Sequence, residues 1–354
     1  MSGLDGRPQR LWPEEEDVVP ILAPRRESDA DHARTHRRPR PPRLTAADLT
    51  PERMLRPAAT PPEAGWRRSL YQLSGGLLSV PPSAAELRRR ELIAQVKTPI
   101  LGCRTVAFVS RKGGVGKTTT CLLVGHTFAS YRGDRVIAVD ANPDAGTLGH
   151  RLRRETTETL PSLLRERQAI RRYADVRAYT SQAATRLEVI AGDECGEIDR
   201  PIGRGDVGRA VATLAGHFNL LCLDAAAGVL TPANQGVLAA ADQIVVVSAA
   251  SLDTARAASA TLDWLEDHGY KELAASAVAV VNAIRNEPSV VDLERIEEHF
   301  ASRCRACIRI PWDGHLHSGT EVALEELRPE TREAYLELAA AIARGFAELV
   351  QRRS

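Results

Sequence analysis

A glycine-rich loop between an apolar run and a helical pattern sets the tightest limit on the fold of this chain. The run TVAFVS at 105–110 leads directly into RKGGVGKTTT at 111–120, and apolar residues at helical spacing follow. A strand, a glycine-rich loop, Lys-Thr and a helix in this order form the layout of a phosphate-binding P-loop. A plain glycine-rich turn is the alternative, and Gly-Lys-Thr-Thr in this context disfavours it. The chain is therefore expected to bind a nucleotide.

Different residues of this loop have different predicted roles in binding the nucleotide. The glycines let the backbone approach phosphate oxygens, and the loop N–H groups and the helix N-terminus favour an anion. Lys117 is expected to contact the β- and γ-phosphates, and the Thr118 hydroxyl is expected to bind Mg²⁺. The predicted phosphate-binding residues of the loop are Lys112, Gly113, Gly114, Val115, Gly116, Lys117, Thr118 and Thr119.

From residue 104 onward, short apolar runs alternate with longer helical patterns. The predicted strands are 105–110, 135–140, 187–191, 220–224, 243–248, 277–281 and 307–310. Several are nearly continuous Val, Ile, Leu and Ala, which is typical of strands buried on both faces of a parallel sheet. We therefore expect an α/β fold over 104–354, with a doubly wound, mostly parallel sheet of about seven strands.

The use of lysine points to the same loop. Only four lysines occur in the chain, and two of them, Lys112 and Lys117, lie within one six-residue stretch. Lysine and arginine are not interchangeable at a phosphate. The sequence KGGVGKTT resembles the deviant Walker A motif of the MinD/ParA family of ATPases, although Arg111 replaces the usual first glycine. The resemblance implies that Lys112 reaches the nucleotide of the partner subunit in a homodimer formed on ATP binding; an ordinary surface lysine is the alternative.

Two aspartates lie where this family has its magnesium-binding motifs. RVIAVDANPDAGTLG at 135–149 is similar to the second motif and first switch, and LLCLDAAAG at 220–228 is similar to Walker B with the second switch. The resemblance implies that Asp140 and Asp224 hold Mg²⁺ through water and that the Gly228 amide contacts the γ-phosphate. A helix cap or turn is the alternative for either aspartate alone.

Two further segments resemble the positions at which the family binds its base. AVAVVN at 277–282 ends a predicted strand, and RIPWD at 309–313 ends the next. The resemblance implies that Asn282 contacts the adenine edge and that Pro311 and Asp313 lie near the base, so ATP with Mg²⁺ is the expected ligand. Asparagine at a strand end is often only a turn former.

The first switch departs from the family pattern at one position. Most relatives carry a second carboxylate two residues after the strand-end aspartate, and this chain has Asn142 there. An amide can orient a water molecule but cannot accept its proton. Lys112, Lys117, Asp140 and Asn142 are the predicted catalytic residues of an ATPase that is slow without a partner. Asp144 could substitute for the missing carboxylate.

The first 103 residues have a different composition. Residues 1–64 contain 11 of the 21 prolines and one aromatic residue, so they are predicted to form a disordered Pro/Arg-rich arm. Residues 65–103 carry six basic and two acidic residues, with a helical pattern that begins after Ser83. This basic helical segment could dock on the main domain, on a partner or on an anionic surface. We expect residues 1–103 to bind a protein partner.

Composition favours a soluble protein of the cytoplasm. Hydrophobic residues make up 43% of the chain, but no apolar run approaches the ~20 residues that span a bilayer. The N-terminal sequence shows no signal-peptide pattern. Six scattered cysteines do not suggest a disulfide framework. Buried free thiols are favoured for Cys304 and Cys307 over a zinc site completed by His315 and His317.

Four segments carry a narrower resemblance, to actinobacterial MinD-like ATPases associated with type VII secretion. These segments are 65–76, 83–99, 140–149 and 173–182. The resemblance implies an ATP-binding and hydrolysing dimerisation switch that positions or energises a cell-envelope or type VII secretion apparatus. Two alternatives remain, a nucleotide-binding regulatory scaffold with little hydrolysis and a DNA-associated partition ATPase. DNA is not favoured, because residues 104–354 carry 30 basic and 33 acidic residues.

The last predicted helix is amphipathic. Its apolar residues at helical spacing are Tyr335, Leu338, Ile342, Phe346 and Leu349. Some MinD relatives end in a short membrane-binding helix, but the terminal QRRS supplies only two cations, so packing on the sheet is favoured. Any association with the inner face of the plasma membrane is expected to be peripheral and to occur through a partner.

Overall fold

The computed structural model describes residues 82–143, 146–192, 201–228, 231–286 and 291–353. Residues 80–354 form one compact unit, which is the unit considered below. The predicted arm at 1–64, the segment 65–81 and Asp144 lie outside the described residues.

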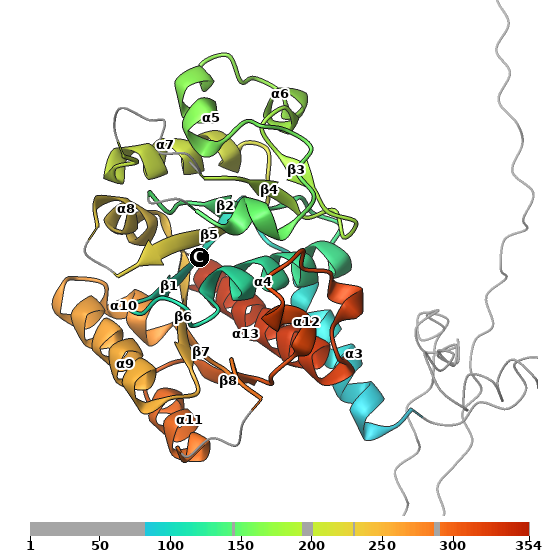
Figure 1. Cartoon of the computed structure of the whole chain (residues 1–354), viewed down its shortest axis with the longest axis vertical. Coiled ribbons are helices and arrows are strands. Elements are labelled where there is room, and N and C mark those ends of the chain that lie inside the picture. Colours follow the sequence, from blue (N-terminus) through green and yellow to red (C-terminus); the bar gives the residue numbers. More distant parts are fainter. Residues whose placement is uncertain (1–81, 144–145, 193–200, 229–230, 287–290, 354) are drawn as a thin grey trace, which may run out of the picture. The chain divides into compact units, whose positions relative to one another are not determined.

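The described residues form one eight-stranded sheet with the order β3-β4-β2-β5-β1-β6-β7-β8 (Figure 1). The strands are β1 Arg104–Ser110, β2 Val136–Asp140, β3 Ser181–Gln182, β4 Glu188–Ile190, β5 Leu220–Ala227, β6 Gln243–Ala249, β7 Val278–Asn282 and β8 Ala306–Ile310. Neighbouring strands pair in parallel except β3 and β4, which are antiparallel. The predicted doubly wound, mostly parallel sheet is confirmed. Strand β3 is not among the seven predicted strands, because its two residues are too few to show a hydrophobic pattern in the sequence.

Helices cover both faces of the sheet. The longer helices are α3 Ala84–Val96, α4 Lys117–Tyr131, α5 Leu160–Glu166, α7 Arg204–Ala215, α8 Pro232–Ala240, α9 Leu252–Asp267, α11 Leu293–Ala301 and α13 Pro329–Arg353. Shorter segments are η2 Leu148–Arg151, α6 Tyr173–Arg177, α10 Lys271–Ala275, α12 Gly314–His317 and η3 Leu324–Glu326. Helices α3, α4 and α13 share one hydrophobic core with the sheet, and α5, α7, α8, α9 and α11 share the other.

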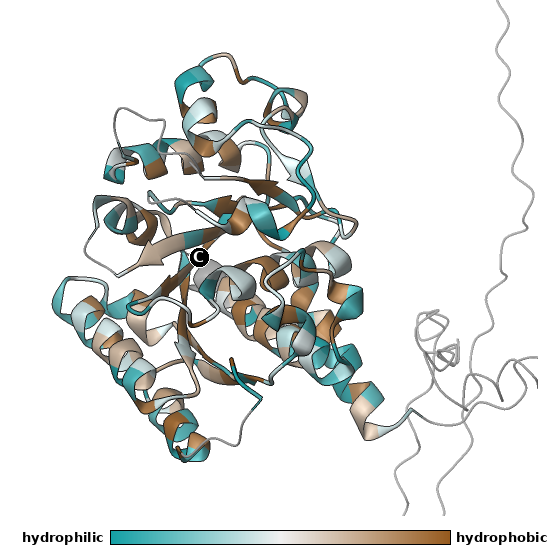
Figure 2. Ribbon diagram, viewed as in Figure 1, coloured by the Kyte–Doolittle hydropathy of each residue, from teal (hydrophilic) through white to brown (hydrophobic). Residues whose placement is uncertain are grey.

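Strand β1 shows why the central strands are largely apolar. Every residue of β1 is buried. Val106 and Phe108 belong to the core beneath α4 and α13, whereas Ala107 and Val109 belong to the opposite core. Because successive side chains of a strand point to opposite faces, a strand between two helical layers must be apolar at both sets of positions. Figure 2 shows the hydrophobic strands between helices whose outer surfaces are largely hydrophilic.

The carboxyl ends of the parallel strands meet at one edge of the sheet. Strand β1 ends at Ser110, beside β5, and Asp140 at the end of β2 pairs in register with Asp224. On the other side of β1, Asn282 at the end of β7 pairs with Ile310 at the end of β8. Polar strand-end residues that are far apart in the sequence therefore lie along the same edge, which is where doubly wound folds bind ligands.

Helix α13 is buried in the core over most of its length. Tyr335, Leu338, Ile342 and Phe346 are each at most 2% exposed. The Phe346 ring lies 6.4 Å from the ring of Phe128 on α4, measured between centroids. These contacts confirm that the amphipathic pattern reflects packing on the sheet; the side chain of Leu349 lies outside the described residues. No described helix is both long enough and apolar enough to cross a bilayer.

Helix α3 docks on this same helix. The Ser83 hydroxyl accepts a 3.2 Å hydrogen bond from the Glu86 amide and caps α3, as the sequence predicts. Arg89 forms a 3.0 Å ion pair with Glu333 of α13. After α3 ends, the buried guanidinium of Arg132 donates to the Val96 carbonyl at 2.6 Å. Of the three docking surfaces considered for this basic helix, the one it contacts is the main domain.

The two cysteines of the CxxC sequence are free thiols. Cys304 is buried, and Cys307 is half-buried. His315 is engaged elsewhere, because its Nδ1 lies 3.0 Å from Glu326 and its Nε2 accepts from the Ala323 amide. Within the described ranges, no group of three or more His, Cys, Asp or Glu side chains is arranged to hold a metal ion. These contacts favour free thiols over zinc.

The packing of α13 leads to a prediction about stability. Leu338→Ala should lower the free energy of unfolding by about 2–5 kcal/mol, because it leaves a cavity in a fully buried site. Urea denaturation followed by circular dichroism measures this change. Leu87→Ala is the matched control, since Leu87 is 53% exposed on α3 and its loss should change stability by less than about 0.5 kcal/mol. Equal effects of the two substitutions would contradict the burial of α13.

Candidate nucleotide-binding site

The loop between β1 and α4 has a backbone that requires glycine. Gly114 and Gly116 have φ angles of 73° and 83°, in the left-handed region. A Cβ on Gly116 would also lie 2.8 Å from Nδ2 of Asn282, closer than a side chain can approach. Gly116 is the N-cap residue of α4, so Lys117 and Thr118 occupy its first turn. The two functional side chains therefore project from the start of a helix whose N-terminus favours anions.

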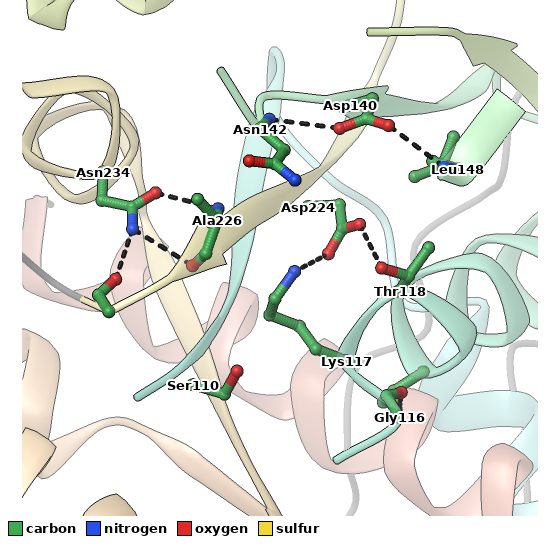
Figure 3. Close-up of polar contacts among 12 residues, drawn as sticks. Ser110, Gly116, Lys117, Thr118, Asp140, Asn142, Leu148, Asp224, Ala226 and Asn234 are labelled. Atoms are coloured by element: carbon green, nitrogen blue, oxygen red, sulfur yellow. Dashed lines mark hydrogen bonds and ion pairs between the residues drawn. The ribbon is translucent and has the colours of Figure 1, made fainter. Parts of the chain in front are cut away.

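Asp224 holds both of these side chains. Its Oδ1 lies 2.5 Å from Nζ of Lys117, and its Oδ2 accepts a 2.6 Å hydrogen bond from the Thr118 hydroxyl (Figure 3). Asp224 is only 2% exposed. A buried carboxylate needs a cation and hydrogen-bond donors to offset its lost hydration, and these two residues supply them. The predicted Walker B aspartate is thus in direct contact with the P-loop lysine and threonine.

Asp140 lies beside Asp224 and is fully buried. Its two oxygens accept hydrogen bonds of 3.1 Å from the amides of Asn142 and Leu148. Burial, together with the charge of Asp224, raises the pKa of the Asp140 carboxyl to about 7. The chain passes very close to this carboxyl, since a Cβ on Gly146 would lie 2.1 Å from Asp140 Oδ2. Two carboxyl groups therefore lie beside the P-loop. Their oxygens are hard donors, the kind of ligand that Mg²⁺ binds.

The Gly228 amide is already engaged. It donates a 2.8 Å hydrogen bond to the Ser110 carbonyl at the end of β1. Contact with a γ-phosphate would require this bond to break. Asn234 of α8 holds the same segment, because its side chain accepts from the Ala226 amide at 3.0 Å and donates to the Gly228 carbonyl. Sequence reasoning missed Asn234, although Thr231-Pro232 marks a helix start that brings its first turn to a strand end.

The residues predicted to bind the base have structural contacts as well. Asn282 donates from Nδ2 to the Val115 carbonyl at 2.8 Å and to the Thr120 hydroxyl at 3.1 Å, while its Oδ1 is buried without a hydrogen-bond partner in the described structure. Asp313 is buried and accepts from the His315 amide at 3.1 Å and from the Arg328 amide at 2.9 Å. Asp313 therefore fixes the wall of the site, and Asn282 keeps one free acceptor.

A cavity of about 490 Å³ joins these elements. It is lined by the P-loop, by Asn142, by Asn282 and by the segment 310–313 with Pro311 and Asp313. Asp224 contacts two of the lining residues, Lys117 and Thr118, and Asp140 pairs with Asp224 in the sheet. The volume is within the range of small-molecule sites. Lining residues to which the sequence analysis gave no role in the site include Thr147, Arg151, Trp312 and Tyr335. Thr147 and Trp312 lie within the motifs at 135–149 and 309–313, whereas Arg151 lies outside them.

Lys112 lies at the rim of the cavity. Its side chain is 51% exposed and forms a 3.0 Å ion pair with Asp253, itself 75% exposed. Lys117, by contrast, is 11% exposed. An exposed ion pair contributes little stability and is easily exchanged for another partner. The two lysines of the loop therefore differ: one is held inside the site, and the other is accessible from outside.

A P-loop whose lysine and threonine contact an aspartate of the neighbouring parallel strand defines a P-loop nucleotide-binding domain. Residues 106–313 match the family of the CobQ/CobB/MinD/ParA nucleotide binding domain, and the chain belongs to this family. The family resemblance found in the sequence is thereby confirmed.

Individual relatives agree with this assignment. The chain is 34% identical over 287 residues to the ESX-1 secretion-associated protein EspI of Mycobacterium tuberculosis H37Rv, an alignment that covers 80% of this chain and 42% of EspI. The chain thus spans less than half the length of that relative. The fold is similar to a ParA family ATPase from Chlorobium tepidum, at TM-score 0.56 and 22% identity over 67% of this chain and 98% of that one. The Pyrococcus furiosus cell division ATPase MinD has TM-score 0.56 and 20% identity, over 69% and 99% of the two chains.

The raised pKa of Asp140 leads to a pH-dependent prediction. Below its ordinary pKa of 3.8 the carboxyl is protonated in the folded and unfolded chains, so it costs no stability there. Between 3.8 and about 7 only the unfolded chain releases the proton, and stability falls until the full cost is present above pH 7. Asp140→Asn should therefore stabilise the protein more at pH 8 than at pH 5, by roughly 1–3 kcal/mol.

Urea titrations in EDTA at the two pH values measure this difference. Asp267→Asn changes an exposed aspartate of α9 and should follow the wild type at both. A stabilisation by Asp140→Asn that is the same at pH 5 and pH 8 would show that the Asp140 carboxyl does not titrate as described.

Proposed function

We propose that this chain is an ATP-dependent dimerisation switch that binds Mg-ATP in the cavity above Asp140 and Asp224. One observation carries the proposal: Lys117 and Thr118, at the start of α4, both contact the buried carboxylate of Asp224. A cation and a hydroxyl assembled beside two carboxyl groups, under a loop of exposed amides, match the needs of a triphosphate with its metal ion.

The chain's own groups exchange partners when the nucleotide binds. Lys117 leaves Asp224 and pairs with the β- and γ-phosphates, while the amides of 113–119 donate to phosphate oxygens. Thr118, Asp140 and Asp224 are the residues that would hold Mg²⁺, the two aspartates through water. A bound Mg²⁺ would neutralise charge that develops on the phosphates. The carboxylate of Asp224, which loses Lys117, would then face the positive charge of the bound Mg²⁺.

The free acceptor of Asn282 supports recognition of adenine. Its Oδ1 is buried and without a partner among the described residues, and the exocyclic amino group of adenine is a donor. The base of guanine presents a carbonyl at the corresponding position, which would place two acceptors together. We therefore assign the base end of the cavity to Asn282, with Pro311 and Asp313 in its wall.

The rate of hydrolysis depends on the residue at position 142. Asn142 lines the cavity at the position from which a carboxylate could accept a proton from the attacking water, and its amide can only orient that water. We propose slow turnover that a partner accelerates, with Lys112, Lys117, Asp140 and Asn142 around the reacting phosphate. A regulatory scaffold with little hydrolysis is the second candidate, and Asn142 is the observation that favours it. Phosphate release measured with a partner present separates the two.

The cellular role is proposed from the relative. EspI is secretion-associated, so we propose that this switch positions or energises a type VII secretion or cell-envelope apparatus, with residues 1–103 contacting a protein partner. The expected location is the cytoplasm, with peripheral association at the inner face of the plasma membrane through that partner. A DNA-associated partition role is disfavoured by the slightly acidic composition of 104–354.

Removal of Lys117 tests nucleotide binding. Lys117→Ala should weaken Mg-ATP binding by at least about 100-fold, because the β- and γ-phosphates lose their cation. Isothermal titration calorimetry measures the affinity, and thermal unfolding checks that the variant is folded although Asp224 loses its ion pair. Lys271→Ala, which removes an exposed lysine of α10, should bind as the wild type does. Unchanged affinity in Lys117→Ala would refute the assigned site.

Removal of Lys112 tests dimerisation. Lys112→Ala should bind Mg-ATP as a monomer and fail to dimerise with a non-hydrolysable ATP analogue, because the proposed contact of Lys112 is with the nucleotide of the other copy. Light scattering coupled to gel filtration gives the mass. Lys97→Ala, at the end of α3, is the matched control and should dimerise. If Lys112→Ala forms a dimer as stable as that of the wild type, Lys112 does not make the proposed contact with the nucleotide of the other copy.

A further inference from the structure

Arg151 ends η2 and lines the same cavity as the P-loop. It belongs to none of the motifs that the sequence analysis used. One guanidinium nitrogen, Nη1, is buried and has no hydrogen-bond partner in the described structure. A guanidinium carries five N–H donors and no acceptor, and a buried charged donor without a partner is costly. A positively charged donor at this place therefore needs an acceptor that the described chain does not supply.

The other cations of the cavity are paired differently. Lys117 is held by Asp224 at 2.5 Å, and Lys112 is held by Asp253 at 3.0 Å. Arg151 forms no ion pair with any carboxylate of the described residues. Arg151 thus adds a charge to the cavity wall that no acidic side chain of the described residues neutralises.

The backbone fixes both ends of η2, the short helix that ends at Arg151 in the cavity wall. The first residue of η2, Leu148, donates to the carboxyl of Asp140, which lies beside Asp224 under the P-loop. At the other end of η2, the Arg151 carbonyl accepts a 2.9 Å hydrogen bond from the Val322 amide. The short helix is therefore fixed between the aspartates and the segment after α12, and the position of Arg151 does not depend on its own side-chain contacts.

We propose that Arg151 is a nucleotide-binding residue whose guanidinium donates to phosphate oxygens of the bound nucleotide. The inference rests on the proposed binding of Mg-ATP and adds a ligand outside the P-loop. Phosphate oxygens suit this side chain best, because they are charged acceptors that a guanidinium can bind in a bidentate manner. Unlike Lys117, Arg151 gives up no carboxylate partner when it binds phosphate.

The test compares Arg151→Gln with the wild type in the full chain. Affinities for Mg-ADP, Mg-ATP and adenosine are measured by isothermal titration calorimetry, with adenosine in competition against Mg-ADP. Arg151→Gln should weaken Mg-ADP and Mg-ATP by about 10- to 100-fold, the range for a lost charge-assisted hydrogen bond, and leave adenosine unchanged. Arg153→Gln is the matched control, because it removes an exposed arginine two residues away, and it should bind as the wild type does.

The outcomes separate this inference from the function on which it rests. If the wild type binds Mg-ATP and Arg151→Gln binds it equally well, only the inference is overturned. An equal loss of adenosine affinity would overturn the assignment to phosphate, and a wild type that binds no nucleotide would overturn both proposals. Thermal unfolding without nucleotide should be the same for the two glutamine variants. If Arg151→Gln does not fold, Arg151→Lys is used, and it should still bind Mg-ADP several-fold more weakly than the wild type.

Discussion

Two carboxyl groups buried side by side are the constraint on which the rest of this site depends. Asp140 ends β2, Asp224 lies three residues before the end of β5, and the two residues are partners in register. Two ionised carboxylates cannot share such a place without compensation. Lys117 and Thr118 compensate Asp224, whereas the described residues that donate to Asp140 are backbone amides, and burial beside Asp224 raises the pKa of Asp140 to about 7. The same contacts hold the P-loop in place, because Lys117 and Thr118 of the loop stabilise the carboxylate of Asp224.

Close backbone approaches connect the remaining parts of the site. Gly116 leaves room for Asn282, whose amide nitrogen ties β7 to the P-loop carbonyl of Val115. Gly146 leaves room for the carboxyl of Asp140. Any side chain at these glycines would push the base wall or the first switch away from the loop. The phosphate end and the base end are thus parts of one packed unit, and a change at one is transmitted to the other through contacts shorter than 3.5 Å.

The family assignment and the structure explain different things. Membership in the CobQ/CobB/MinD/ParA family accounts for the sheet, the P-loop and the strand-end aspartates. It does not account for the docking of α3 on α13 through Arg89 and Glu333. That contact extends the compact unit upstream of β1, and the unit begins at residue 80. Helix α3 also packs directly on α4, the helix that begins with Lys117.

The sequence by itself determined the features that depend on near neighbours along the chain. Seven strands, the P-loop, the Ser83 cap and the buried face of α13 follow from apolar periods, glycine spacing and capping residues, all within a few residues of one another. The order of Asp140 and Asp224 after the loop also predicted that both would lie at the site, because parallel strands end at one edge.

The tertiary structure alone decided which atoms of these residues are free. Asn282 and Val115 are 167 residues apart, and Lys117 and Asp224 are 107 apart. Packing between distant segments also determines three further features. The Gly228 amide is occupied by a hydrogen bond, Asn234 donates to the Gly228 carbonyl, and Nη1 of Arg151 has no partner among the described residues. A sequence pattern reports which groups a residue carries, whereas the partner of each group is set by distances between elements, which only the folded chain fixes.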